Sequence, residues 1–403
     1  MRVLLVSPFY APSAAVGAKR FSFLSRLFQR RGFDVAVLTL DDATTQRRDE
    51  SLPRVQSILA VGSLLPYPLA RTDWLAKVYE RLLTRVLAVP DEYVGWLLPS
   101  VAAGRRLIAQ APPDVVIATG PPFTAFVTGA LLSRQAKARL VLDYRDPWTA
   151  YDWPKSTAWR KQGTVRRALE KWLIERADAL VFATAAMQEK FEEVFGRGRT
   201  DRTRVITNGF DASDTVLPAP LPGTSFNILY AGSFYGERQI GILAEAAAEV
   251  ARRGRVGEKP VAIHVFGSIK PADWARIRAC GMQERVVEHA PVDHAEVLRY
   301  MKAADALYLP SGSDVSYALP FKLFDYLSVR RPVLAVAPRY SAIGMLMREL
   351  RCGELAPPDQ PGAVADALER LVLGASDCSF DGAEQYSWEA VGGRYIELLQ
   401  SLR

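Results

Sequence analysis

Short runs of apolar, often β-branched residues alternate with helical patterns along most of the chain, and this alternation limits the possible folds more than any other feature. The first run is Val3–Val6, which is followed by the loop Pro8–Gly17 and by a helical pattern that ends at Gly32. A strand buried on both faces appears as a continuous apolar run, and strands that alternate with helices form parallel sheets. We therefore predict an α/β protein whose parallel sheets are covered on both faces.

A proline-rich stretch interrupts the alternation once. Residues 212–225 have the composition of a linker, with Pro218, Pro220, Pro222 and Gly223. Before the linker, strands are predicted at Val3–Val6, Asp34–Leu40, Asp114–Ala118, Arg139–Asp143, Ala179–Ala183 and Thr203–Ile206. After it, strands are predicted at Asn227–Tyr230, Val261–Phe266, Arg285–Glu288, Ala306–Leu309, Pro332–Ala335 and Gly353–Leu355. Helices are predicted there at Arg238–Arg252, Ala272–Ala279, Ala295–Ala303, Lys322–Leu327 and Ala363–Leu373, and the last stretch, Ser387–Leu402, is amphipathic.

Each half is expected to form a doubly wound, Rossmann-like domain. We place the first domain at residues 1–211, the second at 226–385 and a closing segment at 386–403. Doubly wound sheets bind ligands at the carboxyl ends of their strands. The expected site is therefore a cleft across which the two domains face each other.

Signals for several common kinds of site are missing. No stretch approaches the ~18 consecutive apolar residues that cross a bilayer, and the opening residues are too short for a signal peptide. A dinucleotide fingerprint, a P-loop and a nucleophile elbow are absent. The three cysteines share no metal-ligand spacing, which indicates reduced thiols in a cytosolic protein, and the three histidines all follow residue 263. We therefore expect neither a metal nor a cofactor.

Charge is distributed unevenly between the halves. Residues 1–210 hold 31 lysines and arginines against 20 acidic residues, whereas the rest hold 20 against 24. A basic half favours an anionic partner, although a surface kept soluble by its charge is the alternative. The basic, tryptophan-bearing helices at Trp74–Leu87 and Trp159–Leu173 suit an anionic membrane surface, or else are core helices with outward arginines. We expect a cytoplasmic protein with a peripheral contact at the inner face of the plasma membrane, and no nucleic acid, since no motif for it is present.

The first half offers two candidate segments. The loop that ends at Gly17 leads into a helix, so its backbone N–H groups could meet an anion; a plain strand–helix connection is the alternative. Asp143, Arg145 and Asp146 follow directly from a predicted strand, and Pro147 favours an extended conformation at Asp146. Their place at a strand end favours a functional site, and a buried structural Asp–Arg pair is the alternative.

The second half offers two more. Gly232, Ser233 and Arg238 follow its first strand, and an arginine near a helix start is best explained by an anion. Lys322 is predicted in the first turn of another helix, with Asp325 three residues later on the same face. Backbone N–H groups and Lys322 could hold a diphosphate while Asp325 accepts hydrogen bonds from a ribose. The alternative is an ordinary Lys–Asp surface pair.

These segments together resemble glycosyltransferase family 4, the retaining, nucleotide-sugar-dependent enzymes with two Rossmann-like domains, called the GT-B fold. The resemblance spans nearly the whole chain, and its most specific part is Pro320–Leu334. Asp143–Trp148 also resembles a motif of bacterial members that build surface polysaccharides. The other matching segments are Pro8–Gly17, Asp178–Ala183, Val205–Asp211 and Gly232–Arg238.

The resemblance implies a division of roles. Arg238 and Lys322 would neutralise the donor diphosphate and Asp325 would hold the ribose. Asp146, beside Asp143 and Arg145, would face the reacting centre from the acceptor side. Further donor contacts would come from Gly17, Gly232, Ser233, Tyr317, Ala318 and Leu319. The donor would be a nucleotide diphosphate sugar, the acceptor a carbohydrate or a lipid-linked sugar, the configuration would be retained without a metal, and segment 386–403 would cross back to the first domain.

Two features depart from the family. Tyr317 stands where the family usually has the first of two glutamates, and Asp325 stands for the second. The first half also has no histidine to place near the sugar. A nucleotide-sugar epimerase of the same fold and a non-catalytic nucleotide-sugar-binding protein therefore stay open as alternatives.

Overall fold

The computed structural model describes residues 1–41, 48–65, 89–151, 157–198, 200–211, 216–232, 234, 238–255, 259–290, 292–312 and 315–403. They divide into two compact units, Met1–Thr207 with Trp388–Arg403 and Asn208–Ser387. The first boundary falls before residue 211, because the Phe210 N–H donates to the Tyr386 carbonyl (3.0 Å) and Phe210 pairs with Ser387. These contacts place residues 208–211 and 386–387 in the second unit.

The first unit is built on a seven-stranded sheet whose neighbouring strands are all parallel. Its strands are β1 (Arg2–Val6), β2 (Asp34–Leu40), β3 (Ser57–Val61), β4 (Val115–Gly120), β5 (Arg139–Tyr144), β6 (Ala179–Phe182) and β7 (Thr203–Val205). Its described helices are α1 (Val16–Arg30), α3 (Leu97–Gln110), α4 (Thr124–Ala136), α5 (Thr157–Arg176), α6 (Ala185–Phe195) and α13 (Trp388–Ser401), with short 3₁₀ turns at Val94–Trp96 and Thr200–Arg202.

The second unit repeats this plan with a six-stranded parallel sheet. Its strands are β8 (Phe226–Ala231), β9 (Val261–Phe266), β10 (Val286–His289), β11 (Ala306–Pro310), β12 (Val333–Val336) and β13 (Gly353–Ala356). Its described helices are α7 (Gly241–Arg253), α8 (Pro271–Ala279), α9 (His294–Ala303), α10 (Phe321–Val329), α11 (Ala342–Leu350) and α12 (Pro361–Val372), with a 3₁₀ turn at Ala383–Tyr386.

These elements confirm the predicted α/β class and every predicted strand, with ends shifted by at most a residue or two. The prediction missed β3 and α11. It also began the helix after β8 too early: α7 starts at Gly241, so Arg238 lies in the preceding loop. The predicted helix at Trp74–Leu87 lies outside the described residues. None of the helices described is long and apolar enough to cross a membrane.

Strand order locates the edge at which each unit can bind a ligand. The orders are β3-β2-β1-β4-β5-β6-β7 and β10-β9-β8-β11-β12-β13, so each sheet begins with the doubly wound order 3-2-1-4-5. The chain changes direction across the sheet between β1 and β4 and between β8 and β11. Ligands of doubly wound sheets bind beside the carboxyl ends of the strands at such a switch point.

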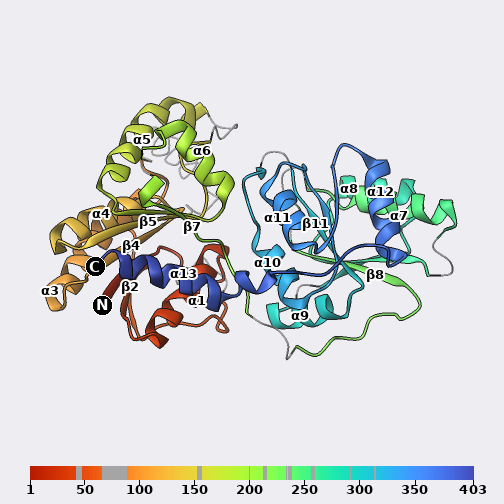
Figure 1. Cartoon of the computed structure of the whole chain (residues 1–403), viewed down its shortest axis with the longest axis horizontal. Helices are drawn as coiled ribbons and strands as arrows, with labels where there is room; N and C mark the ends of the chain where they lie inside the picture. The colour runs from red at the N-terminus through yellow and green to blue at the C-terminus, as the bar shows by residue number, and fades with distance from the viewer. Residues whose placement is uncertain are drawn as a thin grey trace. The chain divides into compact units, whose positions relative to one another are not determined.

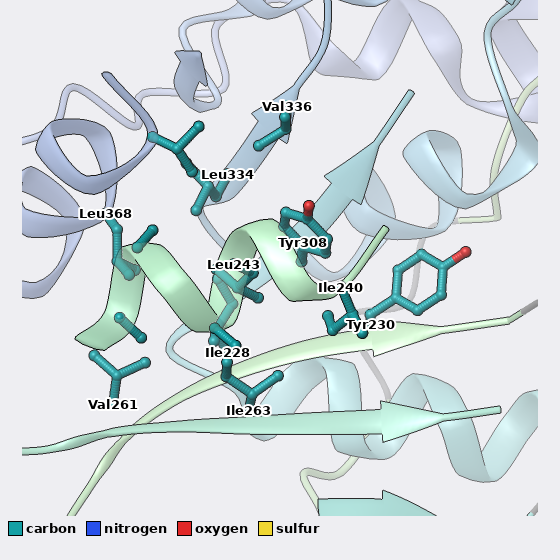
Figure 2. Close-up of a cluster of buried hydrophobic side chains, with 14 of the residues drawn as sticks. Ile228, Tyr230, Ile240, Leu243, Val261, Ile263, Tyr308, Leu334, Val336 and Leu368 are labelled. Carbon is teal, nitrogen blue, oxygen red and sulfur yellow. The ribbon is translucent and has the colours of Figure 1, made fainter. Parts of the chain in front are cut away.

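Alternation along each central strand of the second unit fills cores on both faces of its sheet. In β8, Ile228 and Tyr230 belong to a core beneath α7 and α12, while Leu229 and Ala231 belong to another beside α10. Figure 2 shows the first of these cores, with the Tyr230 ring at the carboxyl end of its strand. The position of Tyr230 near the end of β8 thus places its hydroxyl at the ligand-binding edge of the sheet.

The last helix of the chain belongs to the first unit, as Figure 1 shows by the position of blue α13 beside α1. The Trp388 ring stacks on Phe23 at a centroid distance of 5.1 Å. Gly392 lies so close to α1 that a methyl group there would meet Leu27 Cδ2 at 1.9 Å. The close approach of the two helices therefore depends on a residue without a side chain.

Candidate functional site

Lys322 lies in the first turn of α10, as predicted, at the carboxyl ends of β8 and β11. Its Nζ donates to the Tyr230 hydroxyl at 2.7 Å and lies 4.1 Å from the centre of the Tyr230 ring. Gly232 makes this position possible, because a Cβ there would stand 2.4 Å from Nζ. Gly232 also has a φ of +128°, a conformation that favours glycine.

The surroundings of Lys322 destabilise the charged form of its side chain. Burial and, to a smaller extent, the positive charge of Arg238 together lower the pKa of the ammonium group to about 7, while Asp325 opposes the change. Arg238 therefore lies close enough to repel Lys322, although Arg238 comes from the loop before α7 and Lys322 from α10. A ligand with two or more negative charges would relieve this repulsion.

Asp325 lies one turn further along α10 and is partly exposed. Its Oδ1 is 3.2 Å from Nε2 of His294, the first residue of α9. This contact could not be predicted from the sequence, because His294 is brought to Asp325 only by the packing of α9 beside α10. Tyr230 was missed for the same reason.

Among its described residues, the loop before α10 offers backbone groups and no carboxylate. Tyr317, at the position of the family's first glutamate, is a core side chain with 4% of its surface exposed. The Ala318 N–H donates to the Val315 carbonyl at 3.0 Å, and Leu319 follows it, half-buried. Ser233 lies outside the described residues.

In the first unit, Asp143 has a structural role. It is fully buried, and its Oδ2 lies 2.9 Å from the Arg20 guanidinium. Thr119 Oγ1 (3.0 Å) and the Tyr395 hydroxyl (3.3 Å) also donate to it. Arg20 in turn donates to the carbonyls of Ile206 and Thr207. Asp143, predicted on the acceptor side, thus lies in a buried Asp–Arg pair, the alternative given for this segment, with Arg20 as the arginine.

Arg145 and Gly17, predicted from segments far apart, lie together. A Cβ at Gly17 would meet Arg145 Nη1 at 1.9 Å, so the guanidinium rests directly on the glycine. Burial lowers the pKa of Arg145 to about 10, against the attraction of Asp146 and Asp143. Asp146 is half-buried at the start of the next loop, and burial raises the pKa of its carboxyl group.

The loop that carries Asp146 is anchored on its far side. Glu170 of α5 accepts from the Thr149 N–H at 3.0 Å and from its Oγ1 at 2.5 Å. Burial raises the pKa of Glu170 to about 7. Trp148 stacks on Phe123 with ring centres 4.7 Å apart. These contacts hold the backbone on which Arg145 and Asp146 stand.

The described residues hold no metal cluster, and a cavity lies elsewhere in the first unit. Across the described residues, no three His, Cys, Asp or Glu side chains gather to hold an ion. A cavity of about 450 Å³ in the first unit is lined by Arg139, Arg176 and Asp178, at the amino ends of β5 and β6. It lies at the opposite end of the sheet from Asp146, and we assign it no part in the site.

Two family models match the chain. Residues 17–209 match the glycosyl transferase 4-like domain, and residues 225–373 match glycosyl transferases group 1. A glycogen synthase of Mycobacterium tuberculosis is 34% identical over 149 residues, which cover 36% of this chain and 34% of that protein. The match therefore spans about a third of the length of that curated relative.

Solved structures share the fold over the whole chain. A sucrose-phosphate synthase of Thermosynechococcus elongatus has a TM-score of 0.68 at 16% identity, covering 100% of this chain and 99% of that one. Anabaena HepE in complex with UDP-glucose has a TM-score of 0.61 at 16% identity, with 100% of both chains covered. A putative UDP-N-acetylglucosamine 2-epimerase of Listeria monocytogenes has a TM-score of 0.58 at 15% identity, covering 99% and 96%.

Both sheets have the doubly wound order, both family models match in sequence order, and the fold extends over the full length of these neighbours. The chain belongs to the family 4 glycosyltransferases with the GT-B fold.

Proposed function

We propose that the protein transfers a sugar from a nucleoside diphosphate donor to a carbohydrate or lipid-linked acceptor, with retention of the anomeric configuration. The observation that carries the proposal is the pair of cations Arg238 and Lys322 at the switch point of the second sheet. HepE, which shares this fold and was solved in complex with UDP-glucose, supports a nucleotide sugar as the donor.

The two cations would act on the leaving group. When the bond between the sugar carbon and the diphosphate oxygen breaks, negative charge grows on the diphosphate, so nearby cations stabilise the transition state more than the bound donor. Removal of one preorganised partner of this kind costs about 3–4 kcal/mol, or ~10²–10³ in rate. Asp325 would accept from the ribose hydroxyls through the oxygen that does not face His294.

Asp146 would serve the acceptor. Its carboxylate would accept a hydrogen bond from the acceptor hydroxyl and orient it toward the sugar carbon. The new bond forms on the face from which the diphosphate departs, and the hydroxyl proton passes to the departing phosphate oxygen. The diphosphate charge would be balanced by Arg238 and Lys322, so the proposal includes no metal.

The test begins with a thermal-shift screen of nucleoside diphosphates and their sugars, since selective stabilisation would name the donor. Release of the nucleoside diphosphate is then measured with and without candidate acceptors. Asp146→Asn should bind the donor normally and transfer poorly, and normal turnover would refute its role. An altered nucleotide sugar without release of diphosphate would instead support an epimerase. Binding of donors without any turnover would support a non-catalytic protein, an alternative that the core position of Tyr317 keeps open.

A further inference from the structure

The core beneath α7 and α12 contains two hydroxyl groups. Among the buried members of this core that the structure describes, Tyr230 and Tyr308 alone carry a side-chain oxygen or nitrogen, and the others have hydrocarbon or methionine side chains. A phenylalanine would fill the same space without a polar group, and a buried hydroxyl costs stability unless it is hydrogen-bonded. The two hydroxyl groups therefore need an explanation beyond packing.

The two tyrosines lie next to each other on the strands that flank the switch point. In the parallel pair of β8 and β11, Ile228 stands opposite Ala306, so Tyr230 and Tyr308, each two residues further along, are on the same face of the sheet. Their ring centres are 6.2 Å apart, and Figure 2 shows both rings. Both strands end at the edge where doubly wound sheets bind ligands.

The Tyr230 side chain fixes the end of Lys322. Its hydroxyl accepts from Lys322 Nζ at 2.7 Å, and the centre of its ring lies 4.1 Å from the same nitrogen. Phe234 stacks on this ring at a centre distance of 4.3 Å, which restrains the ring. A lysine has a long, flexible side chain, and here the hydrogen bond and the attraction to the ring hold its end at one place.

The Tyr308 side chain fixes the backbone beside the other cation. Its hydroxyl donates to the Gln239 carbonyl at 2.9 Å, one residue after Arg238. The Gln239 side chain accepts from Arg276 of α8, and Arg276 is held in turn by two hydrogen bonds of 2.7 Å to Glu245. These contacts fix the loop from which the Arg238 side chain starts.

We propose that Tyr230 and Tyr308 are positioning residues, whose hydroxyl groups hold Lys322 and the loop that carries Arg238 in place for the donor diphosphate. The proposal rests on the proposed function, in which the two cations meet that diphosphate. Arg238 and Lys322 repel each other, so without such restraints they would separate in the empty site. Restraint by the fold reduces the conformational freedom that is lost on binding, and this strengthens binding.

The proposal is tested by calorimetric titration of UDP, ADP and GDP into the full chain, with the tightest of the three used for every variant. Tyr230→Phe keeps the ring without the hydroxyl and should weaken binding about tenfold at about pH 8. Tyr308→Phe should weaken it about threefold to tenfold. Tyr326→Phe is the matched control and should bind normally, because the buried Tyr326 hydroxyl donates to the Tyr308 carbonyl (2.9 Å) rather than to Lys322 or the Arg238 loop.

The pH dependence separates positioning of Lys322 from a general loss of structure. A hydrogen bond to a charged group favours its charged form, so loss of the Tyr230 hydroxyl should lower the pKa of Lys322 further. The defect of Tyr230→Phe should therefore be several-fold larger at about pH 8 than at about pH 6. Arg238 and Asp325, the other charged groups that act on Lys322, are the same in both proteins.

Double variants show which cation each hydroxyl acts through. Tyr230→Phe should have little further effect in the Lys322→Met protein, and Tyr308→Phe little further effect in the Arg238→Met protein. Normal binding by both folded tyrosine variants, losses that persist in the methionine proteins, or an equal defect in Tyr326→Phe would overturn the proposal. If Tyr308→Phe does not fold, the Tyr230 variants decide alone. Absence of diphosphate binding to the unaltered protein would instead remove the proposed function, and this proposal with it.

Discussion

Lys322 should make the affinity for a nucleoside diphosphate depend on pH. In the free protein, burial and Arg238 lower the pKa of its ammonium group from 10.5 to about 7. A bound diphosphate would replace lost hydration and oppose Arg238, which raises this pKa again. Because the pKa is higher in the complex, binding is strongest below pH 7 and weakens as the pH rises above it.

The size of the effect follows from the protonated fraction. With a pKa of about 7, this fraction falls about eightfold between about pH 7.5 and pH 8.5, equivalent to about 1.2 kcal/mol of binding free energy. Ionisation of the phosphate contributes little there, because its second pKa is about 6. At about pH 8, binding should take up about 0.9 proton per nucleotide.

Isothermal titration calorimetry in two buffers of different ionisation enthalpy measures both quantities. Lys322→Arg is the matched control, since arginine keeps its charge throughout this range and should remove the pH dependence. An affinity of the unaltered protein that is constant from pH 7.5 to 8.5, without proton uptake, would refute the reasoning.

Three further predictions concern the first unit. Burial raises the pKa of Glu170 from an ordinary 4.5 to about 7, so the folded protein loses stability as the pH rises through this range. Chemical denaturation should therefore show the free energy of unfolding of Glu170→Gln gaining up to ~3 kcal/mol relative to the unaltered protein between pH 4.5 and 8. The same pH dependence of stability in both proteins would contradict this. Asp143→Asn leaves the buried Arg20 charge unpaired and should lower the free energy of unfolding by about 3–5 kcal/mol; a loss below ~1 kcal/mol would argue against the pair. Gly392→Ala should lower the free energy of unfolding by about 1–3 kcal/mol, because the added methyl group would meet Leu27 of α1 at 1.9 Å. Gly393→Ala, where the methyl group meets open space, should be neutral or stabilising. Equal effects of the two substitutions would show that α13 does not pack on α1 as described.

Local signals were enough to predict most of the fold. Continuous apolar runs marked the buried strands, and β9 was predicted to the residue. The edge strand β3 was missed because it has only five residues, none of which is fully buried, so no long apolar run marks it. For α11 a signal existed: Ser341 caps the helix by accepting from the Gly344 N–H at 3.1 Å, and a serine before an apolar periodic run predicts a helix start.

The candidate site was predicted only where its residues follow strand ends. Lys322 could be placed because a helix start is readable from sequence. Its contact with Tyr230 could not, since 92 residues separate the two. The same holds for Asp143. Its position at the end of a strand was predicted correctly, but its partner Arg20 could not be predicted because 123 residues separate the two. Pairings of this kind depend on how the helices and strands pack together, and the spacing of residues along the chain does not reveal that packing.

Calorimetric titration of the best-binding nucleoside diphosphate tests the central claim most directly, using the unaltered protein and the Arg238→Gln, Lys322→Gln double variant. The account predicts that the double variant, still folded by circular dichroism, loses at least about a hundredfold in affinity for the diphosphate, while its weaker affinity for the nucleoside alone is unchanged. Equal diphosphate affinities in the two proteins would contradict it.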